Sequence, residues 1–488
     1  MYKKIVLIII AGIFVNGQVW TQDFGFGFGF DDVDSGGSSG GFLNSLSVSI
    51  GGEVSAAVIG YFDEMIKGAD SIVTRDMFMF SGKLNFLAKS SLAQAVINLK
   101  LVPALVPVSI DEAYLNVFYG GFDISAGLKK VAWGKADQFG PLDVINMPDA
   151  SKIFIEMADN TSLMGVKIAN PMIHASFRFG QFSKIEGIFL PNFEIVSMAV
   201  SSMFDGSSEF LSLVSSPVSD KWIPASMNKL YDNDGNLLMP FKKTDTSGLD
   251  YAQAGLRFTT TIGSADIGIQ YFYGRMFQPA AKFNLPKNQI PDMNDLGNPD
   301  NYPSFEFLFN IYHQAGLDYA QVIAGFNIRA EVAANITEDL KGDDGLVYNP
   351  SIGWSFGFDR NLFAGINLNV QGNGTVRLFN DKIGSSGEPF DQYYNLNPNY
   401  DVEYDTSMTS TRITAMLSRK FMRDELELRA AVVWGIEDMD FAIIPALIWT
   451  RDELRAAFSG GFFIGERDGQ LGQYKYNNFL KLSVTYIF

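Results

Sequence analysis

The chain has 488 residues, of which 47% are hydrophobic and 14% aromatic, with no cysteine and a formal net charge of −17. The negative charge argues against nucleic acid as a partner, because no basic stripe is present to neutralise phosphates. The lack of cysteine excludes a disulfide scaffold and a lipoprotein anchor.

The N-terminus has the pattern of a secretory signal peptide. Lys3 and Lys4 precede an apolar run, residues 5–15, that is too short to span a bilayer as a helix. We expect a signal peptide over residues 1–22, followed over 23–42 by a low-complexity arm rich in Gly, Phe, Asp and Ser. No run of 18 apolar residues follows, so we expect an exported chain without a membrane helix.

Alternation of apolar and polar residues fills most of the chain beyond this arm and predicts β-strands. Within 424–434, for example, Leu426 and Leu428 fall on one face, whereas Glu427 and Arg429 fall on the other. The expected strands are 44–60, 77–88, 91–103, 109–119, 122–133, 161–180, 183–190, 250–261, 264–277, 304–317, 321–335, 348–358, 361–379, 409–419, 424–434, 440–449, 453–464 and 476–488.

The connections between these strands alternate between short and long. We interpret 161–180 as one strand with a bulge at Pro171, because the apolar parity changes there and proline is tolerated at bulges. Short links are expected near Ser90, Val106, Gly120, Gln181, Gly263, Asp318, Asp359, Met422 and Thr450. The long loops are 134–160, 191–249, 278–303, 336–347, 380–408, 435–439 and 465–475. Ser90 and Val106 fit this scheme least well, since consecutive links lie at opposite ends of a barrel.

The last ten residues, 479–488, form an alternating strand that ends on the aromatic Phe488. This ending resembles the C-terminal strand of bacterial outer-membrane β-barrels, where the assembly machinery reads a terminal aromatic. The resemblance implies an all-β, transmembrane, antiparallel up-and-down barrel of about 18 strands (16–18) over residues 43–488. It also implies a location in the cell outer membrane, with outer-membrane lipid, lipopolysaccharide and the barrel-assembly machinery as partners. A β-sandwich would show the same alternation with its apolar face turned inward.

Four short motifs between residues 112 and 149 carry a second resemblance. They are Glu112-Ala113-Tyr114-Leu115, Gly120-Gly121-Phe122, the segment from Trp133 to Asp137 and the segment from Asn146 to Asp149. They are similar to a family of uncharacterised Gram-negative outer-membrane barrels with a porin-like W-G-x-[AS]-D element and an N-P-x-D-type element. Met147 separates the asparagine from the proline, which departs from the family pattern. The resemblance implies the fold and the location, and it implies no substrate.

Strand parity also predicts which charged residues line the interior. The expected lumen-lining and selectivity residues are Lys83, Lys129, Arg257, Arg329, Glu331, Arg412, Glu427, Arg429, Glu453, Arg455 and Lys481. Loop 134–160 is expected to fold inward as a constriction, with Trp133, Lys135, Asp137, Asp143 and Asp149 as its main residues. The charges either form ion pairs that fix the wall, such as Glu427 with Arg429 and Glu453 with Arg455, or form a cationic ladder that guides anions.

A closed barrel of about 18 strands leaves an aqueous channel. We therefore predict a porin-like channel for passive diffusion of small hydrophilic solutes, with a mild preference for anions. The alternatives are a substrate-specific transporter for fatty acids or a polysaccharide, and a surface adhesin or structural barrel. We do not expect an enzyme, because the two histidines, His174 and His313, lie away from the predicted outer rim, with His313 near the periplasmic end. We expect no cofactor and no metal site.

Overall fold

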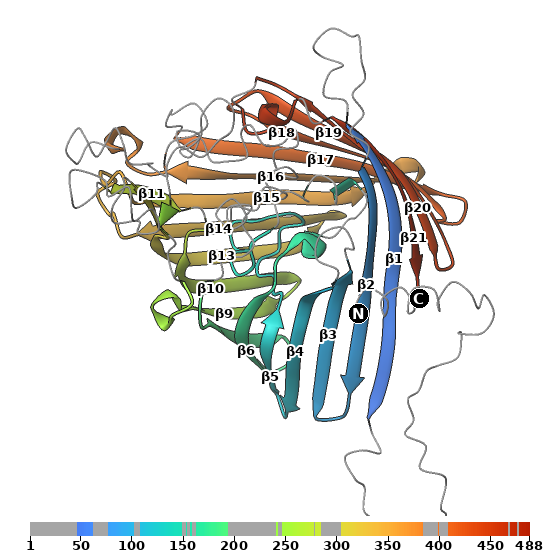
Figure 1. The fold of residues 1–488 in the computed structure, drawn as a ribbon, viewed down its shortest axis with the longest axis horizontal. Helices are drawn as coiled ribbons and strands as arrows, with labels where there is room; N and C mark the ends of the chain where they lie inside the picture. Colours follow the sequence, from blue (N-terminus) through green and yellow to red (C-terminus); the bar gives the residue numbers. More distant parts are fainter. Residues whose placement is uncertain are drawn as a thin grey trace, which may run out of the picture.

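The fold is known from a computed structural model that describes residues 46–61, 77–101, 108–148, 153, 157–158, 163–193, 241–242, 246–277, 279–284, 304–383, 399, 408–466, 469–475 and 478–488. Eighteen strands form one closed sheet, and every neighbouring pair is antiparallel. The strands follow one another around the wall in chain order, and β1 lies beside β21 (Figure 1). The predicted all-β, antiparallel up-and-down barrel is therefore confirmed. Within the described residues, no helix is long and apolar enough to cross a membrane.

Most strand bounds lie within a few residues of those predicted, but the predicted strands 161–180 and 304–317 differ by more, because β6 begins at Asn170 and residues 304–317 contain β12 and only the first part of β13. The first nine barrel strands are β1 (Ser47–Tyr61), β2 (Met77–Lys89), β3 (Ala93–Leu101), β4 (Ser109–Tyr119), β5 (Phe122–Lys129), β6 (Asn170–Phe179), β7 (Ser183–Leu190), β9 (Gln253–Ile262) and β10 (Ala265–Arg275). The other nine are β13 (Ile311–Ile323), β14 (Phe326–Thr337), β15 (Ser351–Asn361), β16 (Ile366–Arg377), β17 (Thr409–Phe421), β18 (Leu426–Gly435), β19 (Asp440–Arg451), β20 (Leu454–Ile464) and β21 (Phe479–Ile487).

The predicted bulge at Pro171 is wrong. Pro171 pairs with Leu128 of β5 in an unbroken register, and β6 begins only at residue 170. On the other side of β6, pairing with β7 starts at Ile173, so the missing N–H of the proline interrupts no bond there. A register shift occurs instead between Asn98 and Leu99, opposite β4.

The predicted turn near Asp318 is also wrong. Asp318 lies inside β13, and the turn falls at Ala324 and Gly325, both of which have positive φ. Aspartate is common in turns, which misplaced the prediction. Here its carboxylate faces the interior, where it forms an ion pair with Arg257 of β9 at 2.6 Å.

The connections separate into two ends of the barrel. The turn end holds the short links 90–92, 120–121, 180–182, 263–264, 324–325, 362–365, 422–425 and 452–453, together with the start of β1 and the end of β21. The opposite end, called the loop end, holds the remaining connections. Val106 lies outside the described residues, but the strand ends on either side of it, Leu101 of β3 and Ser109 of β4, lie at the loop end and not at the predicted turn end. Tyr61 of β1 and Met77 of β2 also lie at the loop end, which restores the alternation.

A second, three-stranded sheet lies at the loop end and was not predicted. It consists of β8 (Phe241–Lys242), β11 (Ala280–Asn284) and β12 (Ser304–Leu308). These strands belong to the two connections that follow β7 and β10, so neighbouring long loops are joined by backbone pairing. The signal peptide and arm predicted over 1–42 lie outside the described residues.

The outward face of the barrel wall is apolar. Register and alternation place exposed residues such as Phe80, Leu115, Leu317 and Leu482 on this face. Among the described strand residues, the outward charged side chains are Arg275, Arg360, Arg419 and Arg451, and all four lie near strand ends. The middle of the outward face therefore carries no charge in the described strands, as a wall in contact with hydrocarbon requires.

The barrel closes around its last residue. The N–H of Gly52 donates to the carbonyl of Phe488 at 2.8 Å, and the N–H of Phe488 donates to the carbonyl of Gly52 at 3.0 Å. A Cβ on Gly52 would lie 2.2 Å from the carbonyl oxygen of Lys83 and 2.9 Å from Cζ of Phe488. Glycine is thus required at this point of the seam by close approach.

We expect Gly52→Val to destabilise the barrel by about 1–3 kcal/mol, because the added carbons must displace the Lys83 backbone or the Phe488 ring. Urea unfolding of the protein in lipid vesicles measures this free energy. Gly187→Val on β7 is the matched control, since a Cβ there meets no atom within 4 Å. Equal destabilisation by both substitutions would contradict the importance of the fit at Phe488.

Candidate functional site: a loop folded into the lumen

Residues 130–169, which connect β5 to β6, are called the lumen loop. The described part comprises 130–148, 153, 157–158 and 163–169. This segment begins a few residues before the predicted constriction loop, because β5 ends at Lys129 and leaves Trp133 outside the strand. Its contacts reach interior side chains on β6, β7, β10, β13, β14, β16 and β18.

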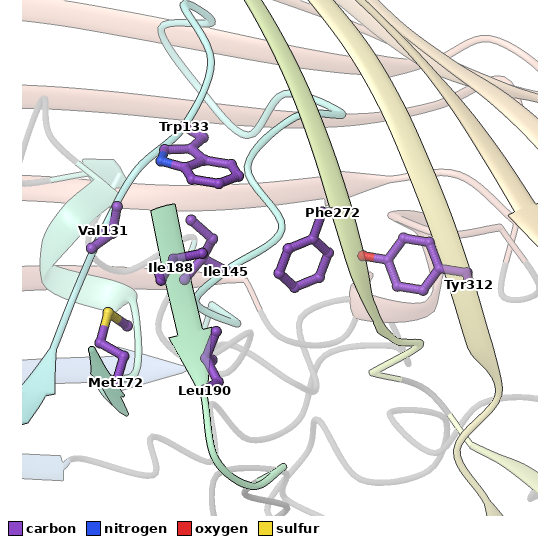
Figure 2. Close-up of a cluster of buried hydrophobic side chains, with 8 residues drawn as sticks. All are labelled: Val131, Trp133, Ile145, Met172, Ile188, Leu190, Phe272 and Tyr312. Atoms are coloured by element: carbon purple, nitrogen blue, oxygen red, sulfur yellow. The ribbon is translucent and has the colours of Figure 1, made fainter. Parts of the chain in front are cut away.

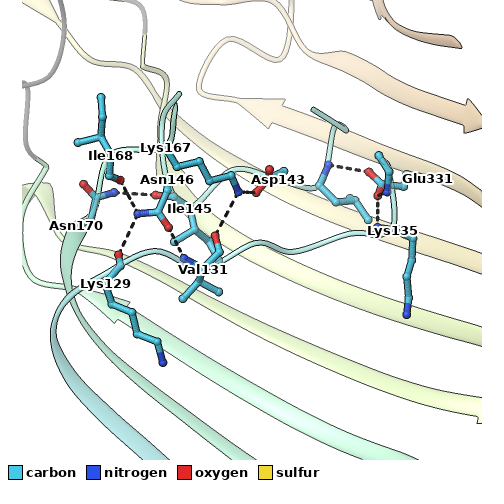
Figure 3. Close-up of polar contacts among 12 residues, drawn as sticks. Lys129, Val131, Lys135, Asp143, Ile145, Asn146, Lys167, Ile168, Asn170 and Glu331 are labelled. Atoms are coloured by element: carbon cyan, nitrogen blue, oxygen red, sulfur yellow. Dashed lines mark hydrogen bonds and ion pairs between the residues drawn. The ribbon is translucent and has the colours of Figure 1, made fainter. Parts of the chain in front are cut away.

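Asn146, which is fully buried, closes the base of the lumen loop. Its Oδ1 accepts the N–H of Val131 at 2.7 Å, and its Nδ2 donates to the carbonyls of Lys129 and Ile168 at 3.1 and 2.7 Å. Figure 3 shows this amide between the outgoing and returning limbs of the loop. A single side chain thus joins three separate stretches of backbone.

An ion pair lies beside Asn146 within the lumen loop. Lys167 Nζ contacts Asp143 Oδ1, and the two side chains are only 3% and 13% exposed (Figure 3). Burial raises the pKa of the Asp143 carboxyl from its ordinary value, and the Lys167 ammonium opposes this shift. The two limbs of the loop are therefore coupled by charge as well as by hydrogen bonds.

The underside of the lumen loop is apolar. Val131, Trp133 and Ile145 pack against interior side chains of the wall, as Figure 2 shows. The wall side of this cluster consists of Met172, Ile188, Leu190, Phe272 and Tyr312. Glycines on the wall make room for the loop: a Cβ on Gly255 would lie 2.7 Å from the Trp133 ring, and one on Gly316 would lie 2.2 Å from Leu142.

Glu331 of β14 holds the next stretch of the loop. Its carboxylate accepts the N–H groups of Lys135, Ala136 (2.7 Å) and Leu142 (3.4 Å). Gly134, with a φ of +96°, allows the chain to turn around this carboxylate. Successive backbone N–H groups directed at one anion form a nest. Here the anion is a wall side chain, and the N–H groups of Lys135 and Ala136 attach the loop to it.

A row of hydrogen-bonded polar side chains on the interior face of the wall supports the loop. It crosses four strands through Arg257–Gln270 at 2.6 Å, Gln270–Gln314 at 3.1 Å and Gln314–Asn335 at 2.9 Å. The same glutamines donate to the loop, Gln270 to the carbonyl of Leu142 and Gln314 to that of Pro141, both at 3.0 Å. The wall therefore satisfies loop backbone groups that burial would otherwise leave unpaired.

Farther along the wall, Asp137 joins the lumen loop to β14 and β16. Its carboxylate is in contact with Arg329, which also pairs with Asp359 at 2.8 Å, and it accepts from Asn369 at 2.8 Å. The N–H of Gln138 donates to Gln371 of β16 at 3.1 Å. Both the predicted inward folding and the contacts of Trp133 and Asp137 with the wall are present.

The lumen loop also reaches β18. Arg429 donates through Nη2 to the carbonyl of Ala158 at 2.9 Å, and Ala158 packs against Ala431 and Ile444. A second segment, at Leu471 and Tyr474 of the link from β20 to β21, packs onto interior residues nearby. This second inward segment was not predicted, since its sequence is as polar as that of an ordinary loop.

The structure places the remaining predicted site residues as follows. Those that face the interior and have described contacts are Lys83 with Glu53 (2.6 Å), Lys129 with Ser125 (2.8 Å) and His174 (3.3 Å), Lys135 with Asp266 (3.7 Å), Arg412 with Gln470, and Arg429 with Glu427 (3.9 Å). Arg455 and Lys481 face the interior from β20 and β21. Asp149 lies outside the described residues.

Two further sequence predictions need correction. Glu453 lies exposed in the turn between β19 and β20, so it is not a lumen residue and does not fix the wall. His313 lies at the loop end of β13, not near the turn end, and it faces outward, where Tyr271 Oη lies 2.6 Å from its Nδ1. Both errors come from a displaced strand boundary. Strand β20 begins at Leu454, one residue after Glu453, and β13 begins at Ile311, so His313 lies near its start.

No protein-family model matches the chain, and no curated protein matches it. Among solved structures, the chain is similar to Pseudomonas aeruginosa OccK3 (9% identity, TM-score 0.46, covering 90% of this chain and 95% of that one). It is similar to Escherichia coli Wzi, described as an outer-membrane, carbohydrate-binding β-barrel involved in capsule assembly (9%, 0.43, 92% and 85%). It is also similar to Salmonella typhi OmpF (7%, 0.39, 92% and 99%).

We expect Glu331→Gln to loosen the lumen loop, because hydrogen bonds to a charged group contribute about 1.5–3 kcal/mol each. The chain has no cysteine, so Ala136→Cys provides a single thiol whose reaction with a water-soluble maleimide reports loop opening. In the Glu331→Gln background this thiol should react about ten-fold faster or more. Glu453→Gln in an exposed turn is the control, and an unchanged rate with Glu331→Gln would show that the carboxylate does not hold the loop.

A second prediction concerns the buried pair of Lys167 and Asp143. Lys167→Met should destabilise the protein by about 3–5 kcal/mol, because it leaves a buried carboxylate without its cation. Addition of Asp143→Asn should recover part of this loss, and urea unfolding of the two single variants and the double variant gives the coupling energy. If the effects of the two substitutions simply add, the pair does not stabilise the loop.

Proposed function

We propose that this protein is a porin-like channel of the outer membrane that allows passive diffusion of small hydrophilic solutes. The observation that carries the proposal is the polarity of the barrel: apolar outside, polar inside, with a loop fixed within the lumen by wall side chains. An 18-stranded wall encloses more space than its own side chains fill, and the lumen loop then determines how much of that space remains.

The proposed location rests on the outward face. An apolar band whose described charges lie only near strand ends matches the bilayer, in which charged groups are costly at the middle and tolerated at the interfaces. Aromatic pairs lie toward the strand ends, such as Phe122 with Phe177 at 4.4 Å between ring centroids. Phe488 at the seam is the residue through which we propose recognition by the barrel-assembly machinery, and lipid and lipopolysaccharide are the proposed surroundings.

The proposed ion preference is weak. Many interior cations lie beside carboxylates, including Lys83 with Glu53 and Arg257 with Asp318. These pairs support the interpretation in which charge fixes the wall. Arg412 of β17 is exposed in the interior and contacts a neutral glutamine, Gln470, so it is our candidate for a mild anion preference.

The other predicted functions have less support. The interior apolar clusters are covered by Trp133 of the lumen loop and by Leu471, which disfavours a continuous apolar path for fatty acids. We propose no catalytic role: His174 lies between Lys129 and Glu186, and the other histidine faces outward. A structural barrel or adhesin differs from a channel in conductance, which an experiment can measure.

Purified protein in planar bilayers should form stable channels whose reversal potential in a salt gradient shows a mild anion preference. Arg412→Gln should shift this potential toward cations, because it removes a charge from the channel interior. Arg419 lies on the same strand but faces outward, so Arg419→Gln should leave the reversal potential unchanged. Folded protein that conducts no ions would contradict the proposed function.

A further inference from the structure

One interior strand carries an unusual run of neutral polar side chains. The inward positions of β16 are Asn367, Asn369, Gln371, Asn373 and Thr375, followed at the loop end by Arg377. The register with β17 places Ser418 beside Asn367, Met416 beside Asn369, Thr414 beside Gln371, Arg412 beside Asn373 and Ser410 beside Thr375. We call the three asparagines with Thr375, Ser410 and Ser418 the amide strip. It extends along the wall from the turn end to the loop end.

The asparagines of the amide strip are held in place through their amino ends. Nδ2 of Asn367 donates to Asn361 at 3.0 Å, Nδ2 of Asn369 to Asp137 at 2.8 Å, and Nδ2 of Asn373 to the carbonyl of Phe139 at 3.5 Å. A carboxamide also has a carbonyl oxygen with two lone pairs. All three asparagines are half-buried rather than buried, so their side chains remain accessible from the lumen.

Charged groups also lie beside the strip. Arg329 pairs with both Asp137 and Asp359, Asp359 accepts from Asn327 at 2.6 Å, and Arg412 of β17 lies opposite Asn373. The members of the strip themselves carry no charge, so a solute contacts them through hydrogen bonds. The hydroxyl groups of a solute both donate and accept hydrogen bonds. Carboxamide oxygens and Ser/Thr hydroxyls of the strip can therefore replace the water molecules bound to each of these hydroxyl groups.

We propose that the amide strip binds uncharged, hydroxyl-rich solutes, namely sugars and polyols, as they pass along β16. This inference rests on the proposed channel function and specifies its solute class. The spacing of strand residues favours it as well: inward side chains two positions apart are separated by about 6.6–6.8 Å, so one solute carrying several hydroxyls can contact successive members of the strip.

The test uses ion current through single channels in planar bilayers, with maltose or a polyethylene glycol of equal hydrodynamic size added to the bath. Both solutes obstruct the lumen by volume, but the polymer chain offers ether oxygens that cannot donate to the strip. Maltose should reduce the current in a saturable way, with half-saturation at least about five-fold lower in concentration than for the polymer.

Asn367→Ala combined with Asn369→Ala should remove this difference while leaving the conductance without solute measurable. Thr375→Val is a second variant, which leaves the contact of Asn369 with Asp137 intact. Asn85→Ala is the matched control, because Asn85 faces the lumen from β2, away from the strip. Equal obstruction by maltose and the polymer, or no change in the strip variants, would overturn the inference and leave the channel standing. Absence of conductance from folded wild-type protein would overturn the channel and the solute assignment together.

Discussion

Backbone hydrogen bonding at the seam between β1 and β21 is the constraint on which the rest of this structure depends. In hydrocarbon an unpaired backbone group costs several kcal/mol, so a sheet that spans a membrane must have no free edge. The register from Glu53 to Tyr61 opposite Ile487 to Phe479 provides this closure, and Phe488 extends it to Gly52. Once the wall is closed, its outer face can be apolar, and charged side chains away from the strand ends turn inward.

The inward polar side chains then perform two different tasks. Glu331, Gln270 and Gln314 satisfy backbone groups of the lumen loop, which has no strand partner of its own for most of its length. Glycines such as Gly316 provide the space into which the loop packs. Side chains that the loop does not use remain as the surface that a solute meets. In the proposed channel, the lumen loop would therefore determine the width of the passage and which wall side chains stay accessible.

Much of the barrel could be predicted from the sequence, because a wall with one apolar face imposes a period of two on every strand. Errors arose where one residue type serves two roles. Asp318 resembles a turn residue but is a buried partner of Arg257, and Glu453 follows strand parity yet lies in a turn. Docking of the lumen loop was harder to predict in detail, since it depends on contacts such as Gln138 with Gln371, which are 233 residues apart. In the sequence, only the glycine in Trp133-Gly134 and the apolar composition of the loop indicated that the loop packs against another part of the protein.

In the proposed channel, strand number and loop docking would make separate contributions to selectivity. The number of strands fixes an upper limit on the diameter, and loss of the loop would leave that limit unchanged. Docking also alters the field: Asp137 brings a second carboxylate to Arg329, which already pairs with Asp359 of β15, so one negative charge remains at this contact. A loop held by ion pairs thus changes the charge of the wall where it is attached. In the proposed channel, discrimination by size and by hydrogen bonding acts beside this charge, and neutral side chains such as those on β16 can provide it.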